Sequence, residues 1–384
     1  MELGLTETQE MLRKSARDFL EKECPKSLIR KLEADDLGFS PQVYSGMADL
    51  GWLGLHLPPE YGGSGGSFTD LAILYEEIGR NVVPGPHFVS SVLCADIILS
   101  AGSEAQKRAL LPDIAQGMAT VTLALYESEG GYQPGDIQLS AKRQGEGYVL
   151  EGTKVFVPFA KGATHLLCVA RTAQRTAQAE GISLFLVPTS AKGLDMAALL
   201  SVDVDRQYEV AFHNVAVSHE GLIGQAGQGW DVLQRCRERA NVIQCAEMVG
   251  GAQKALEMAV EYSKQRVQFG RPIGSFQAIQ HKAAGMLSDA DGARFLTYGA
   301  VAKLDAGQQD AVEVAMARAF VAGAFRRVTK EAHQIIAGAA FLVEHDLPFY
   351  YRRAKAMEMF LGDTDFHVEQ VAHRLFDRAA ATGR

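Results

Sequence analysis

The most constraining feature of this sequence is a block of short β-type segments set between two long helical regions. The residues in this block are rich in β-branched and aromatic types, which predicts strands, and turn residues such as Gly145–Gly147 and Glu151–Thr153 separate the segments. The segments are Val121–Leu125, Tyr148–Leu150, Val155–Val157, His165–Ala170, Ile182–Val187 and Val210–Phe212. We therefore predict a central β-barrel or β-sandwich domain over residues 119–222.

Helical patterns occupy both flanks of this block. Thr6 and Gln9 form a predicted capping box at the start of the first helix, and Ser40-Pro41 is a typical helix start. Further helices are predicted at 68–79 and 106–115. From residue 223 onward the pattern is helical again, with faces suited to a packed bundle. The sequence thus predicts a multidomain α and β protein, with a helical N-terminal domain at 1–118 and a C-terminal four-helix bundle at 223–384.

A long predicted helix begins near Gly229 and leads to the segment Arg266–Gln277. Phe269-Gly270, with Pro272 just beyond, predicts the end of this helix, and Gln277 begins a second helical run. The guanidinium of Arg266 presents five fixed donors, which suit a diphosphate, and an amide such as that of Gln277 suits a polar cofactor edge. The alternative role of Arg266 is to complement the helix C-terminus.

Composition narrows the class of protein. The net charge of −8 argues against general nucleic-acid binding, and no apolar run approaches the length of a membrane span. The first 30 residues are typical of an amphipathic helix and not of a signal peptide. The five scattered cysteines contain no C-x-x-C pair, which suits a reducing compartment and argues against a zinc site. We expect a cytoplasmic protein without membrane insertion and without a metal.

The segment 266–277, R-x-x-F-G-x-x-I-x-x-F-Q, closely resembles the acyl-CoA dehydrogenase family of flavoproteins. Further motifs follow in the family's order, so the resemblance covers nearly the whole chain; they are Pro59–Gly63, Glu76-Glu77, Phe212–Val217 and Gln334–Gly338. The resemblance implies the family's α–β–α fold, FAD as cofactor, an acyl-CoA substrate, a tetramer, and an electron-transfer flavoprotein as electron acceptor. It also implies that one set of residues contacts the FAD of a neighbouring subunit, namely Arg266, Phe269, Gln277, Gln334 and Gly338.

The residues that the resemblance assigns to a subunit's own flavin and thioester pocket are altered. Tyr126 stands where the family has a threonine before its Gly-Ser-rich turn, and Tyr132 lies at the end of that turn. Phe156 and Pro158 stand where the family places an aromatic residue and a threonine against the flavin. Phe156 retains a ring for stacking, whereas Pro158 has neither a hydroxyl nor an N–H to donate.

The catalytic base is the largest departure. The family's Tyr-Glu-Gly-Thr segment corresponds to residues 360–364, so Leu361 stands at the position of the usual glutamate, and Thr364 remains a candidate flavin contact. Ala240 occupies the alternative position of the base on the long helix. Asp363 is the candidate substitute, although such a residue commonly serves as a helix N-cap. Glu247 lies on the same long helix, about two turns or roughly 10 Å from Ala240.

Two main hypotheses follow from this pattern. In the first, the chain is an FAD-dependent acyl-CoA dehydrogenase that oxidises the thioester between its α and β carbons within a tetramer, with Asp363 as base. In the second, it is a non-catalytic partner subunit of an α2β2 acyl-CoA dehydrogenase and donates FAD contacts across the interface. A flavin-binding or CoA-thioester-binding protein with other chemistry is a third alternative.

Overall fold

The computed structural model describes residues 4–173 and 179–382. Backbone contacts divide the chain into two compact units. We call the first the helical unit; it comprises Met1–Leu28, Ser67–Val83 and Asn241–Arg384. The second, the sheet unit, comprises Ile29–Gly66 and Pro84–Ala240. The domain boundaries at 118 and 222 remain a prediction.

The N-terminal third of the chain is helical, as predicted. Thr6 forms the expected capping box with Gln9, and Ser40 caps the helix that begins at Pro41. A buried π-helical segment, Phe88–Cys94, precedes the fifth helix. The helices are α1 (Glu7–Glu23), α2 (Lys26–Leu32), α3 (Pro41–Asp49), α4 (Phe68–Asn81), α5 (Ala95–Ala101) and α6 (Glu104–Ala115).

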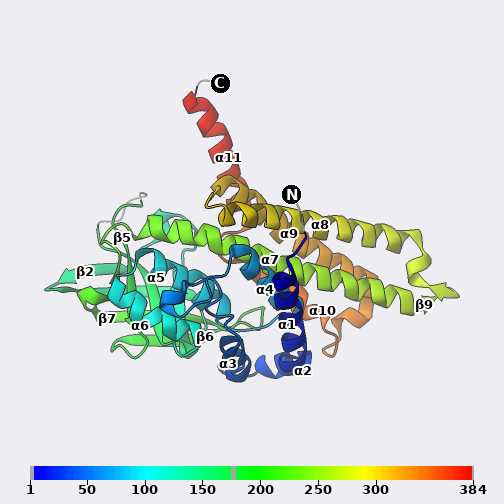
Figure 1. Ribbon diagram of the computed structural model, residues 1–384, viewed down its shortest axis with the longest axis horizontal. Coiled ribbons are helices and arrows are strands. Elements are labelled where there is room, and N and C mark those ends of the chain that lie inside the picture. Colours follow the sequence, from blue (N-terminus) through cyan, green and yellow to red (C-terminus); the bar gives the residue numbers. More distant parts are fainter. Residues whose placement is uncertain (1–3, 174–178, 383–384) are drawn as a thin grey trace. The chain divides into compact units, whose positions relative to one another are not determined.

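The centre of the sheet unit is one eight-stranded sheet (Figure 1). Its strands are β1 (Val121–Ala124), β2 (Ser140–Gln144), β3 (Gly147–Pro158), β4 (His165–Arg171), β5 (Ile182–Pro188), β6 (Leu194–Leu199), β7 (Gln207–Val217) and β8 (Leu222–Ile223). They lie in the order β6-β7-β3-β2-β4-β5-β8, and β1 pairs in parallel with β4. The predicted central β domain is therefore confirmed.

The sheet folds over itself and encloses a hydrophobic core. Tyr148 on β3 and Phe185 on β5 belong to strands that are not neighbours in the sheet, yet their ring centroids are 5.0 Å apart. Alternate residues of β7, such as Val210 and Phe212, point into the same cluster. This alternation is what a sheet with one buried face requires.

Two sequence predictions in this region were wrong. Residues Glu151–Thr153 were expected to form a turn, but β3 continues through them with a shift of register between Leu150 and Gly152. A bulge absorbs the irregularity without ending the strand, and Gly152 takes a φ of 138° there. Strands β2 and β6 were not predicted, because most of their residues are exposed or half-buried, and β2 is also mostly polar.

The C-terminal part of the chain is helical, as predicted. Helix α9 packs against α8, α10 and α11, and α4 packs against α1 and α8 (Figure 1). The helices are α7 (Gly229–Gln265), α8 (Gln277–Asp305), α9 (Ala311–Ile336), α10 (Leu347–Met359) and α11 (Thr364–Thr382). Helix α7 begins in the sheet unit and continues into the helical unit.

Helix α7 ends earlier than its sequence predicts. It stops at Gln265, and the following residues form a hairpin of β9 (Val267–Gln268) and β10 (Arg271–Pro272). The turn residues Phe269 and Gly270 have φ of 53° and 77°, as a two-residue turn with both central residues left-handed requires. The Phe-Gly signal therefore marks the hairpin turn and not the helix end. Gln277 begins α8, as predicted.

Helices α4 and α7 touch through their backbones within the helical unit. A Cβ added to Gly79 would lie 1.8 Å from the carbonyl oxygen of Glu247, and one added to Gly250 would lie 1.8 Å from that of Glu76. Real Cβ atoms do not approach oxygen so closely, so this crossing accepts only glycine at both positions.

Two carboxylates on α4, the buried Glu77 and the half-buried Glu76, bind two other helices. Glu77 accepts hydrogen bonds from Arg17 on α1 at 2.9 and 2.6 Å, and this interaction raises the pKa of the Arg17 guanidinium. Glu76 accepts from Arg294 at 2.5 Å and from Tyr298 at 2.9 Å, both on α8. Helix α4 therefore organises α1, α7 and α8 around itself.

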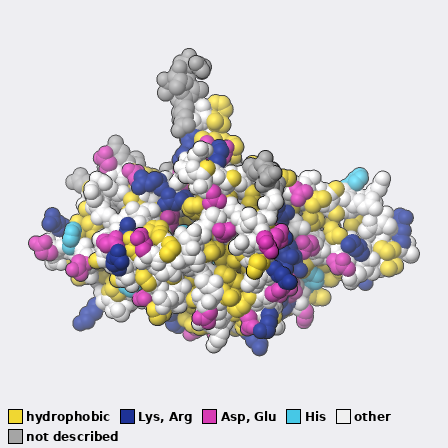
Figure 2. All heavy atoms as spheres, in the orientation of Figure 1, with side chains coloured by type: hydrophobic (Ala, Val, Ile, Leu, Met, Phe, Trp, Pro, Cys, Tyr) yellow, Lys and Arg dark blue, Asp and Glu magenta, His cyan; other side chains and the backbone are white. Residues whose placement is uncertain are grey.

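The surface and the composition add three observations. Acidic and basic side chains are interspersed over the face that Figure 2 shows. None of the helices that the structure describes combines the length and the apolarity needed to cross a membrane. All five cysteines are free and buried, and no group of three or more His, Cys, Asp and Glu side chains suited to a metal ion occurs within residues 4–173 and 179–382.

We predict that Gly250→Ala destabilises the protein by about 3 kcal/mol or more, because the added methyl group forces α4 and α7 apart. The free energy of unfolding in denaturant measures this. Gly285→Ala on α8 is the matched control, because nothing lies within 4 Å of its added Cβ. That control should stabilise the protein by about 0.5–1 kcal/mol, since alanine replaces glycine in a helix interior. Equal effects of the two substitutions would contradict the proposed contact.

Candidate functional site

The residues that the sequence assigns to a neighbour's FAD are all exposed in the helical unit. They lie on the β9–β10 hairpin, at the start of α8 and at the end of α9. Phe269, at the hairpin turn, is 92% exposed. The full set is Arg266, Phe269, Gln277, Gln334 and Gly338.

The polar side chains of this exposed set carry N–H groups that can donate hydrogen bonds to a ligand. The Arg266 guanidinium and the amides of Gln277 and Gln334 make no side-chain hydrogen bond or ion pair within the described residues. The hairpin itself is held in shape, because the Arg271 guanidinium stacks 4.2 Å above the ring of Phe276, which in turn packs edge-to-face against Phe269. These residues therefore suit the diphosphate and polar edges of a ligand presented from outside.

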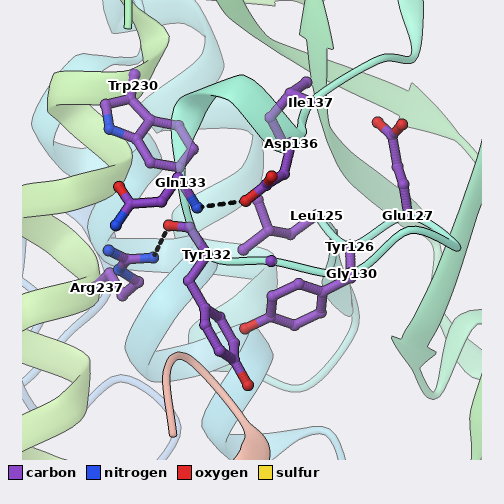
Figure 3. Close-up of a pocket in the computed structure, with 11 residues that line it drawn as sticks. Leu125, Tyr126, Glu127, Gly130, Tyr132, Gln133, Asp136, Ile137, Trp230 and Arg237 are labelled. Carbon is purple, nitrogen blue, oxygen red and sulfur yellow. Dashed lines mark hydrogen bonds between the residues drawn. The ribbon is translucent and has the colours of Figure 1, made fainter. Parts of the chain in front are cut away.

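The segment after β1 differs from this exposed set, because its own side chains fill it (Figure 3). The rings of Tyr126 and Tyr132 pack edge-to-face with centroids 5.8 Å apart. Arg237, buried on α7, donates to the carbonyl oxygen of Tyr132 at 3.3 Å and lies 5.8 Å from the centre of the Trp230 ring. Sequence reasoning did not identify Arg237 or Trp230.

Glu127 is a structural residue of the same segment. Its carboxylate is 2.6 Å from the ammonium group of Lys154, which is fully buried and also donates to the carbonyl oxygen of Leu125. The backbone N–H groups of Gln138 and Leu139 donate to the same carboxylate. Its oxygens are therefore satisfied by the protein, and in Figure 3 the side chain lies apart from the two tyrosines.

The cavity that remains in this segment is small. Its volume is about 10 Å³, which is roughly the space of one water molecule. Its lining includes Tyr126, Gly131, Tyr132, Trp230 and Arg237. This cavity, within the segment itself, is too small for an isoalloxazine ring or a thioester.

The end of β3 carries the two other altered flavin positions. Phe156 is 57% exposed and has a φ of 53°, so its ring is presented outward from a bulge in the strand. Pro158 is buried, and its carbonyl oxygen accepts the hydroxyl of Thr122 at 2.5 Å. The exposed ring of Phe156 can still stack on a ligand, whereas the carbonyl oxygen of Pro158 is occupied by its hydrogen bond within the sheet.

The two positions that the resemblance assigns to the family's base carry buried apolar side chains. Leu361 is fully buried with a φ of 62°, and Ala240 is buried in α7. The loop that holds Leu361 is fixed by Arg318, whose buried guanidinium donates to the carbonyl oxygens of Met357 and Phe360 at 2.5 and 2.7 Å. Asn241 receives a third hydrogen bond from Arg318 at 3.1 Å.

Asp363 and Thr364 lie together at the start of α11. The carboxylate of Asp363 accepts the N–H of Phe366 at 2.8 Å, which is the capping role weighed in the sequence analysis. The Thr364 hydroxyl is 3.2 Å from the carboxylate of Glu358. Glu358 was not identified from the sequence, although its i,i+3 spacing from Lys355 was a visible signal.

The remaining buried carboxylates near this loop are paired. Glu358 is 3.1 Å from Lys355 and 3.5 Å from Arg326. Glu247, the other acid considered from the sequence, is 3.3 Å from Arg353. For Glu358 or Glu247 to accept a proton from a substrate, its ion pair with the neighbouring lysine or arginine would first have to break.

Comparisons with known proteins agree with this arrangement of elements. Family models match residues 6–118 (acyl-CoA dehydrogenase, N-terminal domain), 122–215 (middle domain) and 227–376 (C-terminal domain). The probable acyl-CoA dehydrogenase YngJ of Bacillus subtilis is 31% identical, over 98% of this chain and 100% of its own length.

Two solved structures share the fold and 28% identity, each over 98% of this chain and 100% of the other. One is the butyryl-CoA dehydrogenase of Megasphaera elsdenii, with a TM-score of 0.90. The other is a chain from structural work on the electron transferring flavoprotein of Acidaminococcus fermentans, with a TM-score of 0.91. The chain therefore belongs to the acyl-CoA dehydrogenase family.

Proposed function

We propose that this chain is the non-catalytic partner subunit of an FAD-dependent α2β2 acyl-CoA dehydrogenase. It donates Arg266, Phe269, Gln277, Gln334 and Gly338 to the FAD of a neighbouring subunit, and that neighbour supplies the base. The observation that carries the proposal is the contrast between this exposed set and Leu361, a fully buried apolar side chain where the family has its glutamate.

The chemistry of the family explains why this contrast matters. FAD, when bound, would supply the hydride acceptor for the β hydrogen, and the protein must provide a base for the α proton, donors for the thioester carbonyl, and a dry pocket. Leu361 and Ala240 supply no base, and the segment around Tyr126 and Tyr132 leaves little space. The exposed residues around Arg266 can contact the FAD of a neighbouring subunit without a pocket in their own subunit.

Two further features of the complex are part of the proposal. The substrate of the complete enzyme is an acyl-CoA thioester, as is typical of the family. Its electron acceptor is an electron-transfer flavoprotein, an inference supported by the likeness to the chain from the Acidaminococcus work. The alternative of a self-sufficient enzyme depends on Asp363, which lies two residues beyond Leu361 on the same loop.

Flavin content tests the proposal. We expect the chain purified alone to carry substoichiometric FAD and to oxidise no acyl-CoA. Co-expression with an acyl-CoA dehydrogenase chain from the same source, one that has glutamate at the position of Leu361, should yield a complex with bound FAD and turnover. The flavin spectrum and an acyl-CoA oxidation assay measure both. Full flavin occupancy and turnover by the isolated chain would contradict the proposal.

Arg266→Ala should weaken FAD binding by the co-expressed complex about 10- to 100-fold, because a hydrogen bond to a charged group contributes about 1.5–3 kcal/mol. FAD dissociation measured by flavin fluorescence checks this. Lys264→Ala is the matched control: it removes the same charge two residues away, from an exposed side chain that pairs with Glu261. A comparable loss in both variants would show that Arg266 acts only through general charge.

Asp363→Asn separates the two functional hypotheses. Asparagine retains an oxygen for the N–H of Phe366 and is as good an N-cap as aspartate, so stability should change little. We expect the acyl-CoA oxidation rate of the complex to be unchanged, since Asp363 is a cap in our proposal. Turnover by the chain purified alone that Asp363→Asn abolishes, with flavin still bound and thermal stability retained, would instead identify Asp363 as the base.

A further inference from the structure

Residues 126–137 are tied to the sheet unit by two buried arginines that reach them from different elements. Arg171, on β4, donates to the carbonyl oxygens of Ile137 at 3.0 Å and Pro134 at 2.6 Å. Arg237, on α7, donates to that of Tyr132 at 3.3 Å. The segment is therefore held at its middle and at its end by charged donors.

The turn inside this segment is also closely packed. Gly131 has a φ of 103°, and a Cβ added there would lie 2.0 Å from the carboxylate of Asp136. That carboxylate accepts the backbone N–H of Gln133 at 2.8 Å and closes a short turn (Figure 3). The closed form therefore depends on a glycine at 131 as well as on the two arginines.

We propose that Arg237 is a positioning residue that holds residues 126–137 closed, so that this chain's own pocket takes neither FAD nor a thioester. The inference rests on the proposed function, which it deepens by naming what closes the site. Three observations support it: the hydrogen bond to Tyr132, the edge-to-face packing of Tyr132 on Tyr126, and the cavity of about 10 Å³ that they leave.

Arg237 also has a spectroscopic reporter beside it. Its guanidinium lies 5.8 Å from the ring centre of Trp230, and Trp52 is the chain's other tryptophan. In a Trp52→Phe background, the fluorescence of Trp230 therefore reports on this contact alone. The readout depends neither on catalysis nor on a partner subunit.

The test uses hydrogen exchange of the full chain, with Arg237→Met as the main variant. We expect the amides of residues 128–137 to exchange about 10- to 100-fold faster than in the wild type, since loss of a hydrogen bond from a charged group shifts a local opening equilibrium by that factor. Trp230 should become more accessible to acrylamide. Arg237→Lys should restore part of the protection, because it keeps a charged donor.

Gly131→Ala opens the same segment by a different route and should also accelerate its exchange while Arg237 is intact. Arg239→Met is the matched control, because it removes a second arginine of α7, one that pairs with Asp96 at 2.8 Å and donates to the Ser100 hydroxyl at 3.0 Å. It should leave the exchange of residues 128–137 unchanged. Similar acceleration in Arg237→Met and Arg239→Met would show a general loss of stability and overturn the proposal.

Added FAD provides the decisive comparison. In the wild-type chain, FAD should neither slow exchange at 126–137 nor quench Trp230. Protection of these residues by FAD would overturn the inference, because it would show that the pocket is open to the cofactor. That outcome is distinct from failure of the proposed function, which would appear as the absence of an active complex on co-expression.

Discussion

The backbone contact between α4 and α7 is the constraint on which the helical unit depends. Because Gly79 and Gly250 let the two helices touch, the register of one helix fixes the register of the other. Glu77 then meets Arg17, and Glu76 meets Arg294, so that α1 and α8 take their places against α4. The same crossing fixes the rest of α7, including its end at Gln265, and so determines where the hairpin with Arg266 begins.

Local signals in the sequence were sufficient for much of the fold. The capping box at Thr6 and the N-cap at Ser40 act over three residues, so a sequence pattern contains them completely. The continuity of β3 depends instead on pairing with β7, whose residues lie far away in the sequence. Strand β6 pairs with β7, the next strand in the chain, but most of its residues are exposed or half-buried. The hairpin at Phe269 shows an intermediate case, because the same dipeptide is typical of a helix end and of a turn.

In the candidate site, too, some residues could be predicted from local sequence patterns and others could not. The exposed set around Arg266 and Gln277 was identified from a motif, since its residues lie close together in one segment. Arg237 and Arg318 were not identified, because their partners are distant: 105 residues separate Arg237 from Tyr132, and 39 separate Arg318 from Met357. Both arginines donate to backbone carbonyl groups, and any residue type at the partner position supplies such a carbonyl. Hydrogen bonds from an arginine to the backbone of a distant residue therefore could not be predicted from the sequence.

The resemblance places Leu361 at the position of the family's glutamate, and the buried acids near that loop are paired with cations. A base must hold a carboxylate oxygen ready for a substrate proton, whereas Glu247 and Glu358 each face a cation at 3.3 and 3.1 Å. Separating Glu247 from Arg353 would leave a buried arginine uncompensated, which is costly in a poorly hydrated interior. Arg318 and Asn241 fix the loop around Leu361 and so oppose its rearrangement toward another acid. This pairing supports our proposal that a second subunit supplies the base.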